Sequence, residues 1–151
     1  MPPLREITPV ERSVKQAHAA LEQFFHSLEA SDGVARLRLR VPMRAPTKQF
    51  GLSIDREVRI EARPVRNPGY DAEVMEISWV PEGNAIFPRF DGKLFLTGFG
   101  NAATSYVELD GYYTPPFGAA GQIFDATIGQ RIAQATAREF LADLKAAIET
   151  S

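Results

Sequence analysis

The chain contains no cysteine, which excludes a disulfide framework, a thiolate zinc site, a cysteine nucleophile and a thiol redox switch. Its two histidines, His18 and His26, are eight residues apart on one predicted helix, too far to share a metal ion, so no metal site is predicted. No stretch reaches the roughly 18 apolar residues of a membrane-spanning helix. The N-terminus also lacks the cationic start and apolar run of a secretory signal. The expected compartment is therefore the cytoplasm.

An excess of charge of one sign is also absent, since 17 Lys and Arg face 19 Asp and Glu for a net charge of -2. Nucleic-acid-binding proteins normally carry a basic excess or a basic patch, so no nucleic-acid partner is expected. Of the 151 residues, 44% are hydrophobic and 24% are charged, which is typical of a globular protein. This length predicts a single domain over residues 1–151.

A helix is predicted near the N-terminus. Thr8 can cap it, Pro9 suits its first position, and Glu11 completes a capping box. Apolar residues then recur at steps of three and four as far as about Ala30, which is typical of one buried helix face. They are Val10, Val14, Ala17, Leu21, Phe24 and Leu28. Gly33 suits the left-handed position that follows a helix.

The apolar period changes to two after this helix, which predicts β-strands. Residues 35–41 alternate apolar side chains with a basic row made of Arg36, Arg38 and Arg40. Four further strands are predicted over about residues 52–65, 71–80, 92–97 and 105–113. Turns rather than helices separate the strands, which indicates an antiparallel meander.

A long C-terminal helix is predicted from about residue 122 to residue 149, a stretch without proline. Its predicted buried face consists of Phe124, Ile128, Ile132, Phe140, Leu144 and Ile148. Steps of four drift around a helix of 3.6 residues per turn, so this face must rotate along the helix, as over a curved sheet. The expected fold class is α+β.

Two patterns that could carry chemistry favour a structural interpretation. Residues 98–103 match the G-x-G-x-x-A pattern of a dinucleotide-binding loop, but a strand follows where the phosphate-binding helix should begin. We interpret these residues as a hairpin turn. Glu108 and Asp110 share the strand face opposite Val107 and Leu109, which favours a solvated face over a catalytic pair. No catalytic residue and no cofactor is predicted.

Three segments of the second half resemble a known superfamily. They are residues 90–96 (FDGKLFL), residues 109–118 (LDGYYTPPFG), and Asp125 followed by residues 131–136 (RIAQAT). They are similar to small bacterial proteins of the START-like superfamily, which also contains polyketide cyclases, pathogenesis-related plant allergens and lipid-transfer domains. The resemblance covers roughly residues 50–149. It implies a helix-grip fold, in which a curved antiparallel sheet of five to six strands wraps around the long C-terminal helix and leaves a cavity between them.

The N-terminal third departs from this pattern. Superfamily members usually open with a full strand and two short helices. Here only residues 4–7 are available for the strand, and one longer helix replaces the pair. The short helices normally form part of the mouth of the cavity, so the departure bears on the size and openness of the pocket.

The resemblance implies a binding or carrier protein for a small hydrophobic or aromatic ligand, such as a lipid, a polyketide or a quinone. Tyr113 and Arg131 are expected to orient the ligand, since a buried phenol or guanidinium needs a partner. The residues predicted to line the cavity are Met75, Ile77, Trp79, Phe90, Val107, Leu109, Tyr113, Phe124, Ile128 and Arg131.

Two other functions stay open. A cyclase or dehydratase acting on a polyketide-like substrate would need an acid–base pair inside the cavity, such as an inward-facing His26 beside a carboxylate. An interaction module would have a core filled by its own side chains. It would work through the arginine row on the outer sheet or as a homodimer.

Overall fold

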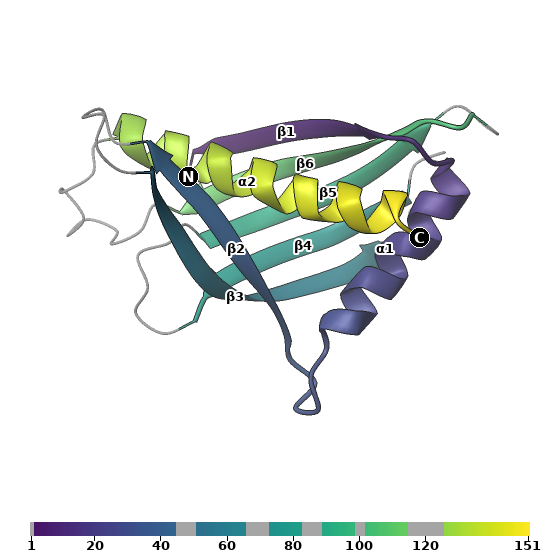
Figure 1. Ribbon diagram of the computed structural model, residues 1–151, viewed down its shortest axis with the longest axis horizontal. Coiled ribbons are helices and arrows are strands. Elements are labelled where there is room, and N and C mark those ends of the chain that lie inside the picture. Colours follow the sequence, from purple (N-terminus) through teal and green to yellow (C-terminus); the bar gives the residue numbers. More distant parts are fainter. Residues whose placement is uncertain (1, 45–50, 66–72, 83–88, 99–101, 115–125) are drawn as a thin grey trace.

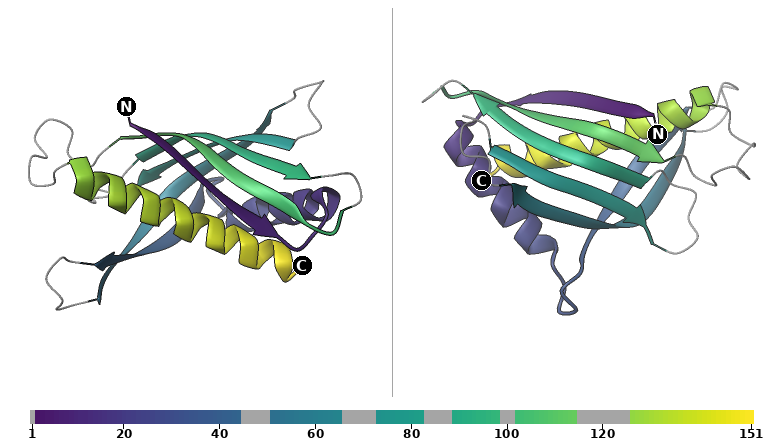
Figure 2. Two further views of the ribbon diagram at one scale, coloured as in Figure 1. Left: turned by 90° about the horizontal axis from the view of Figure 1, so that it is seen from above. Right: turned by 180° about the vertical axis from the view of Figure 1, so that it is seen from behind.

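The computed structural model describes residues 2–44, 51–65, 73–82, 89–98, 102–114 and 126–151. A six-stranded sheet with the order β1-β6-β5-β4-β3-β2 curves around the long helix α2 (Figure 1). The shorter helix α1 lies across one end of the sheet (Figures 1 and 2). The predicted α+β helix-grip fold is confirmed.

The described elements follow one another along the chain as β1 (Pro3–Val10), α1 (Val14–Leu28), β2 (Ala35–Arg44), β3 (Gly51–Val65), β4 (Glu73–Pro81), β5 (Arg89–Gly98), β6 (Ser105–Thr114) and α2 (Ala126–Glu149). Each strand from β2 to β6 pairs antiparallel with the next, which confirms the meander. Strand β1 pairs with β6. Residues 99–101 of the hairpin turn predicted at 98–103 lie outside the described residues.

The predicted start of the first helix is wrong. The segment that contains Thr8 and Pro9 belongs to strand β1, and the helix begins only at Val14. Ser13 caps it: its hydroxyl accepts from the backbone N–H of Gln16 at 3.3 Å, and the Gln16 side chain accepts from the backbone N–H of Ser13 at 3.3 Å. A cap at Thr8 would stabilise only one helix end, whereas pairing with β6 satisfies the backbone along a whole strand.

The two prolines of β1 fit because this strand lies at the edge of the sheet. The backbone N–H of Tyr113 donates to the carbonyl of Pro2 at 3.1 Å. By antiparallel alternation, even-numbered residues of β1 therefore turn their backbone groups toward β6, and odd-numbered residues turn them outward. Pro3 and Pro9 occupy outward positions, where no hydrogen bond to β6 is lost. Proline at such positions discourages pairing with another sheet.

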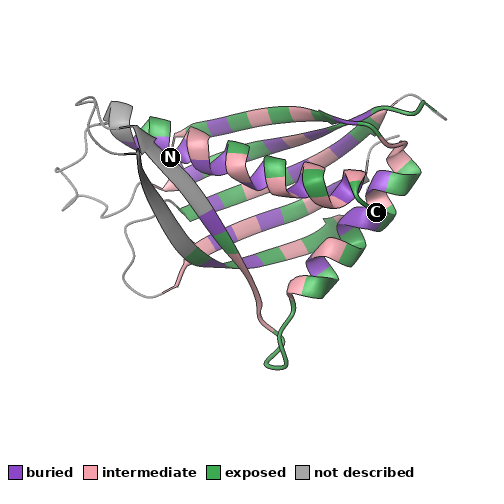
Figure 3. Ribbon diagram, viewed as in Figure 1, coloured by how far each residue is buried: buried purple, intermediate pink, exposed green. Residues whose placement is uncertain are grey.

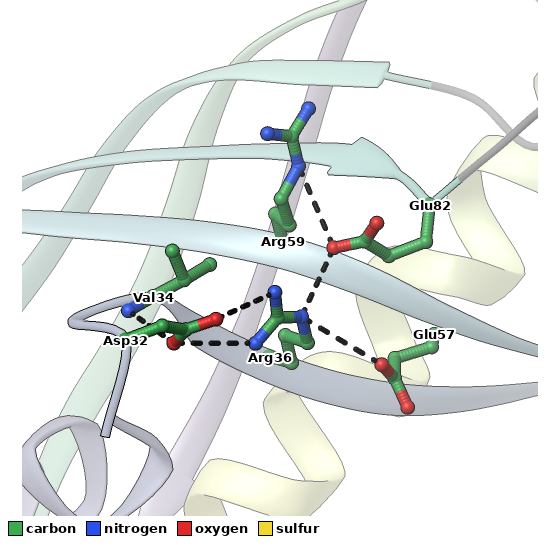
Figure 4. A network of polar contacts seen from close by, with 6 residues as sticks. All are labelled: Asp32, Val34, Arg36, Glu57, Arg59 and Glu82. Atoms are coloured by element: carbon green, nitrogen blue, oxygen red, sulfur yellow. Dashed lines mark hydrogen bonds and ion pairs between the residues drawn. The ribbon is translucent and has the colours of Figure 1, made fainter. Parts of the chain in front are cut away.

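A network of ion pairs fastens the beginning of β2 to the sheet (Figure 4). Arg36 lies 3.1 Å from Asp32, 3.1 Å from Glu82 and 3.9 Å from Glu57. Arg59, the register partner of Arg36, lies 3.5 Å from the same oxygen of Glu82. Glu82 thus holds two neighbouring guanidinium groups, and Arg36 of the basic row also pairs with Glu57 on the next strand.

Strands β5 and β6 approach each other closely at a pair of glycines. Gly92 and Gly111 are register partners. A Cβ atom at Gly92 would lie 2.4 Å from the carbonyl oxygen of Asp110, and one at Gly111 would lie 2.3 Å from that of Asp91. Both would also lie within 3 Å of the tip of the Phe90 ring, at 2.6 Å and 2.9 Å. The absence of side chains at this pair therefore gives the Phe90 ring its place on the sheet.

An aromatic stack rises from this glycine pair toward α2. The rings of Phe90 and Trp79 are stacked with centroids 4.6 Å apart, and the ring of Phe140 packs on Trp79 at 5.1 Å. These three residues are at most 1% exposed. Since Phe140 belongs to α2, the stack connects the middle of the helix to the middle of the sheet.

We expect Gly111→Ala to lower the free energy of unfolding by about 1–3 kcal/mol, because the added methyl group meets backbone atoms that cannot move aside cheaply. Urea denaturation followed by tryptophan fluorescence measures this change. Gly129→Ala in α2 is the matched control. A methyl group there meets no atom within 4 Å, and it should stabilise the helix by up to about 1 kcal/mol. Equal midpoints for Gly111→Ala and the wild type would contradict the account.

Candidate ligand site

The seven predicted cavity residues of the sheet lie on the face toward α2. Alternation of buried and exposed residues along the strands places them there (Figure 3). Ladder pairing sets Trp79, Phe90 and Tyr113 side by side in one row across β4, β5 and β6. Met75 is partly buried. The other six are at most 3% exposed: Ile77, Trp79, Phe90, Val107, Leu109 and Tyr113. Their contact with a ligand stays a prediction.

The predicted cavity residues from the C-terminal region have different outcomes. Phe124 lies outside the described residues, and the side chain of Ile128 is not described. Arg131 is exposed, so the expectation of a buried guanidinium is wrong. At 3.6 residues per turn, Arg131 projects from the same flank of α2 as Arg138, two turns later, and away from the buried Ala133.

The buried face of α2 changes in size along the helix. Among the described residues, the buried face of its first half contains four small residues, Gly129, Ala133, Thr136 and Ala137, beside the larger Ile132. Its second half presents large ones, namely Phe140, Leu141, Leu144 and Ile148. The large residues fill the space below the second half, where Phe140 reaches Trp79. Around the buried Gly129, a Cβ atom would meet nothing within 4 Å. The described residues thus leave room beside Gly129 for additional atoms.

Tyr113 lies at the level of these small residues. Helix α2 and strand β1 run in the same direction (Figure 2), and Arg138 lies 3.3 Å from Glu6. From Glu6 back to Pro2, about four strand residues at ~3.3 Å each span roughly 13 Å. From Arg138 back to Gly129, about nine helical residues at ~1.5 Å each span nearly the same length. Pro2 therefore lies near the level of Gly129. Since Pro2 accepts a hydrogen bond from Tyr113, the tyrosine is at this level as well.

The hydroxyl group of Tyr113 is buried and has no partner in the part of the chain that the structure describes. Three buried residues in the described part of the chain carry hydroxyls: Ser105 and Thr136 at 0% exposure and Tyr113 at 3%. Ser105 donates to the carbonyl of Arg12 at 2.9 Å, and Thr136 donates to that of Ile132 at 2.7 Å. The Tyr113 hydroxyl has no hydrogen-bond partner among the described residues. An unpaired buried hydroxyl costs about 1–3 kcal/mol, so this one requires an explanation.

Burial also raises the pKa of Tyr113. The side chain therefore stays protonated at neutral pH and keeps its proton available for donation. The glycine pair and Phe90 lie beside it on the sheet. What the arrangement offers chemically is an apolar surface with one neutral hydrogen-bonding group, which is how many small-molecule sites fix the orientation of a ligand.

The described histidines do not supply an acid–base pair on this face. The side chain of His26 is 85% exposed and lies 3.9 Å from Glu29 on the surface of α1. His18 lies 3.0 Å from Glu22 on the same helix. Within the described ranges, no group of three histidine, aspartate or glutamate side chains could hold a metal ion. The inward-facing His26 that the enzyme hypothesis requires is therefore not observed.

Two hollows lined by described residues lie on the outer face and at the edge of the sheet. One of about 550 Å³ lies where β3 continues past the beginning of β2, and a second of about 330 Å³ adjoins it. Both are lined by Glu61, Arg63, Ser78 and Asp91. A row of alternating charge crosses this face in register: Arg5, Asp110, Lys93, Glu76 and Arg63. These open, charged hollows differ from the apolar cavity that the sequence predicts.

No family model and no curated protein matches the chain. Solved structures match over nearly its full length. A conserved protein from Geobacillus kaustophilus is 11% identical, with 99% of this chain and 97% of that chain covered and a TM-score of 0.58. A protein from Thermus thermophilus is 12% identical, with 97% of each chain covered and a TM-score of 0.51.

A START superfamily protein from Mycobacterium smegmatis is 13% identical, with 98% of this chain and 97% of that chain covered and a TM-score of 0.49. At such identities the likeness to solved structures shows the fold alone. The helix-grip fold that the resemblance implies is confirmed. In the described part of the chain, neither helix has an apolar stretch sufficient to cross a bilayer.

The carboxyl group of Asp143 yields a prediction about pH. Burial, reinforced by the charge of Glu139 one turn earlier, raises the pKa of Asp143 to about 6. The folded chain then binds this proton more tightly than the unfolded chain, so stability should fall as the pH rises from about 4 to about 6. We expect Asp143→Asn to remove this slope. At pH 7 it should raise the free energy of unfolding by about 1–2 kcal/mol, a value reduced because solvent reaches the side chain.

Urea denaturation at pH 4, 5, 6 and 7 tests this expectation. Glu139→Gln is the matched variant, and it should reduce the slope less, because repulsion is the smaller of the two causes. If the pH profile of Asp143→Asn is parallel to that of the wild type, the pKa of the Asp143 carboxyl group is not raised by folding.

Proposed function

We propose that the chain binds a small hydrophobic or aromatic molecule between the sheet and the first half of α2, as a binding or carrier protein. The observation that carries this proposal is the hydroxyl group of Tyr113, which lies at the level of Gly129 and finds no partner among the described residues. A ligand would supply the missing partner. It would also occupy the space that the small residues of α2 leave.

The energetics favour an apolar ligand. Burial of apolar surface contributes about 25 cal/mol per Å², and the sheet residues around Tyr113 are apolar, with Phe90 as its register partner. The stacked rings of Trp79 and Phe140 form a fixed boundary at the middle of the helix. A fixed boundary reduces the ordering cost of binding, since little of the site has to rearrange.

The described residues give less support to the two alternatives. A cyclase or dehydratase would need an acid and a base at the ligand, whereas His26 is 85% exposed on α1 and His18 lies 3.0 Å from Glu22 on the same helix. An interaction module would use the outer face, where Ile7, Tyr106 and Tyr112 are exposed by 42–56%. Charged residues separate Ile7 from Tyr112, and apolar residues exposed singly are ordinary on protein surfaces.

Native mass spectrometry of the gently purified chain, beside a denatured control, tests the proposal. We expect a reproducible additional mass on the 16.7 kDa chain that is lost on denaturation. A bare chain from several independent preparations would contradict the proposal. A bare dimer would in addition favour the interaction module.

A larger side chain at Gly129 should compete with the ligand. We expect Gly129→Leu to lower the occupied fraction at least about tenfold while the chain stays folded, because a Cβ atom there meets no neighbour. Gly129→Ala is the control and should keep most of the ligand. Trp79→Ala should instead lose about 3–5 kcal/mol of stability as a core residue. Full occupancy of Gly129→Leu would place the ligand elsewhere.

A further inference from the structure

The surroundings of Tyr113 also indicate which chemical group the ligand presents there. We infer that the ligand is uncharged in this region and offers a hydrogen-bond acceptor, of the ketone or quinone carbonyl class, to the Tyr113 hydroxyl. This inference rests on the proposed function, because it concerns the same site.

The acceptor follows from the state of the phenol. A tyrosine hydroxyl has one proton to donate and can also accept. Burial keeps the proton on Tyr113, and no described residue accepts it. A buried donor without an acceptor is rarer in proteins than an acceptor with a free lone pair. The unmet requirement at this site is therefore an acceptor oxygen.

The lack of charge follows from the neighbouring ions. At this level of α2, Arg131 is exposed, and Arg138 is paired with Glu6 at 3.3 Å. A ligand carboxylate would enter an apolar space with one hydroxyl and no free described cation to compensate it. Burying an unpaired charge costs several kcal/mol. A ligand ammonium would meet the same penalty, since Glu6 already has its partner.

The row of side chains on the sheet also favours a planar ligand. Tyr113 is the register partner of Phe90, and Phe90 is that of Trp79. The glycine pair lets the Phe90 ring lie close to the sheet. The surface next to the Tyr113 hydroxyl is therefore aromatic and projects little from the sheet. A conjugated carbonyl compound fits such a surface, because its oxygen lies in the plane of the rings that pack against it.

Three probes with one naphthalene body test the inference on the full chain: 2-acetylnaphthalene as the ketone, 2-isopropylnaphthalene as the hydrocarbon of similar shape, and 2-naphthoate as the anion. Calorimetry should show that the wild type binds the ketone about 3- to 10-fold more tightly than the hydrocarbon, as one neutral hydrogen bond allows. In Tyr113→Phe this preference should vanish while hydrocarbon binding is unchanged. Naphthoate should bind most weakly.

Two further readouts exclude a merely structural effect of the substitution. Tyr113→Phe should be at least as stable as the wild type in urea, because it removes an unpaired hydroxyl. The infrared C=O stretch of the bound ketone should lie at lower frequency in the wild type than in the variant. An unchanged frequency would contradict a hydrogen bond from Tyr113.

The possible failures are distinguishable. A ketone preference that survives in Tyr113→Phe overturns the role of the hydroxyl but leaves the pocket in place. Tightest binding of naphthoate overturns the uncharged ligand. If no probe binds the wild type, the inference is contradicted, and a bare chain in the native mass spectrum would contradict the proposed function as well.

Discussion

The close approach of β5 and β6 at Gly92 and Gly111 determines how the sheet packs against α2. With no Cβ atom on either strand, the Phe90 ring can lie over the pair, Trp79 can stack on Phe90, and Phe140 can pack on Trp79. This column sets the distance between the sheet and the middle of α2. Side chains at the glycine positions would displace the column from its base.

A column at the middle of the helix divides the space between sheet and helix into two parts. Beyond it, the large residues of the second half of α2 complete an apolar core with α1, which contributes Ala17, Leu21 and Phe25. Before it, the small residues that begin with Gly129 lie at the level of Tyr113, whose hydroxyl has no partner within the described ranges. The packing that stabilises the core under the second half of α2 thus also forms a fixed boundary for a ligand under the first half.

Local patterns in the sequence predict most of the fold, and tertiary pairing explains what they miss. Apolar and basic side chains alternate over residues 35–41, and this pattern predicts β2 because one face of the strand is exposed to solvent. The cap signal at Thr8 fails because β1 finds a partner on β6, about a hundred residues away in sequence. Gly92 and Gly111 could not be recognised as a pair from the sequence, since their meaning depends on the register between two strands.

The candidate site was predictable in part. The inward face of the sheet, including Tyr113, follows from strand alternation, but the exposure of Arg131 shows that proximity to buried helix residues does not imply burial. The small stripe that begins with Gly129, Ala133 and Ala137 was missed. These small residues recur every four positions, but a pattern search that counts only large apolar residues does not detect them. The sequence could not show that the Tyr113 hydroxyl has no partner among the described residues, because hydrogen bonds are recognised only in the folded structure.

Electron density for the chain crystallised as purified, between Tyr113 and Gly129, would test the central claim most directly. The account predicts a non-protein molecule there, with an acceptor oxygen about 2.5–3.0 Å from the Tyr113 hydroxyl. Protein side chains that fill this space and bond that hydroxyl would contradict it.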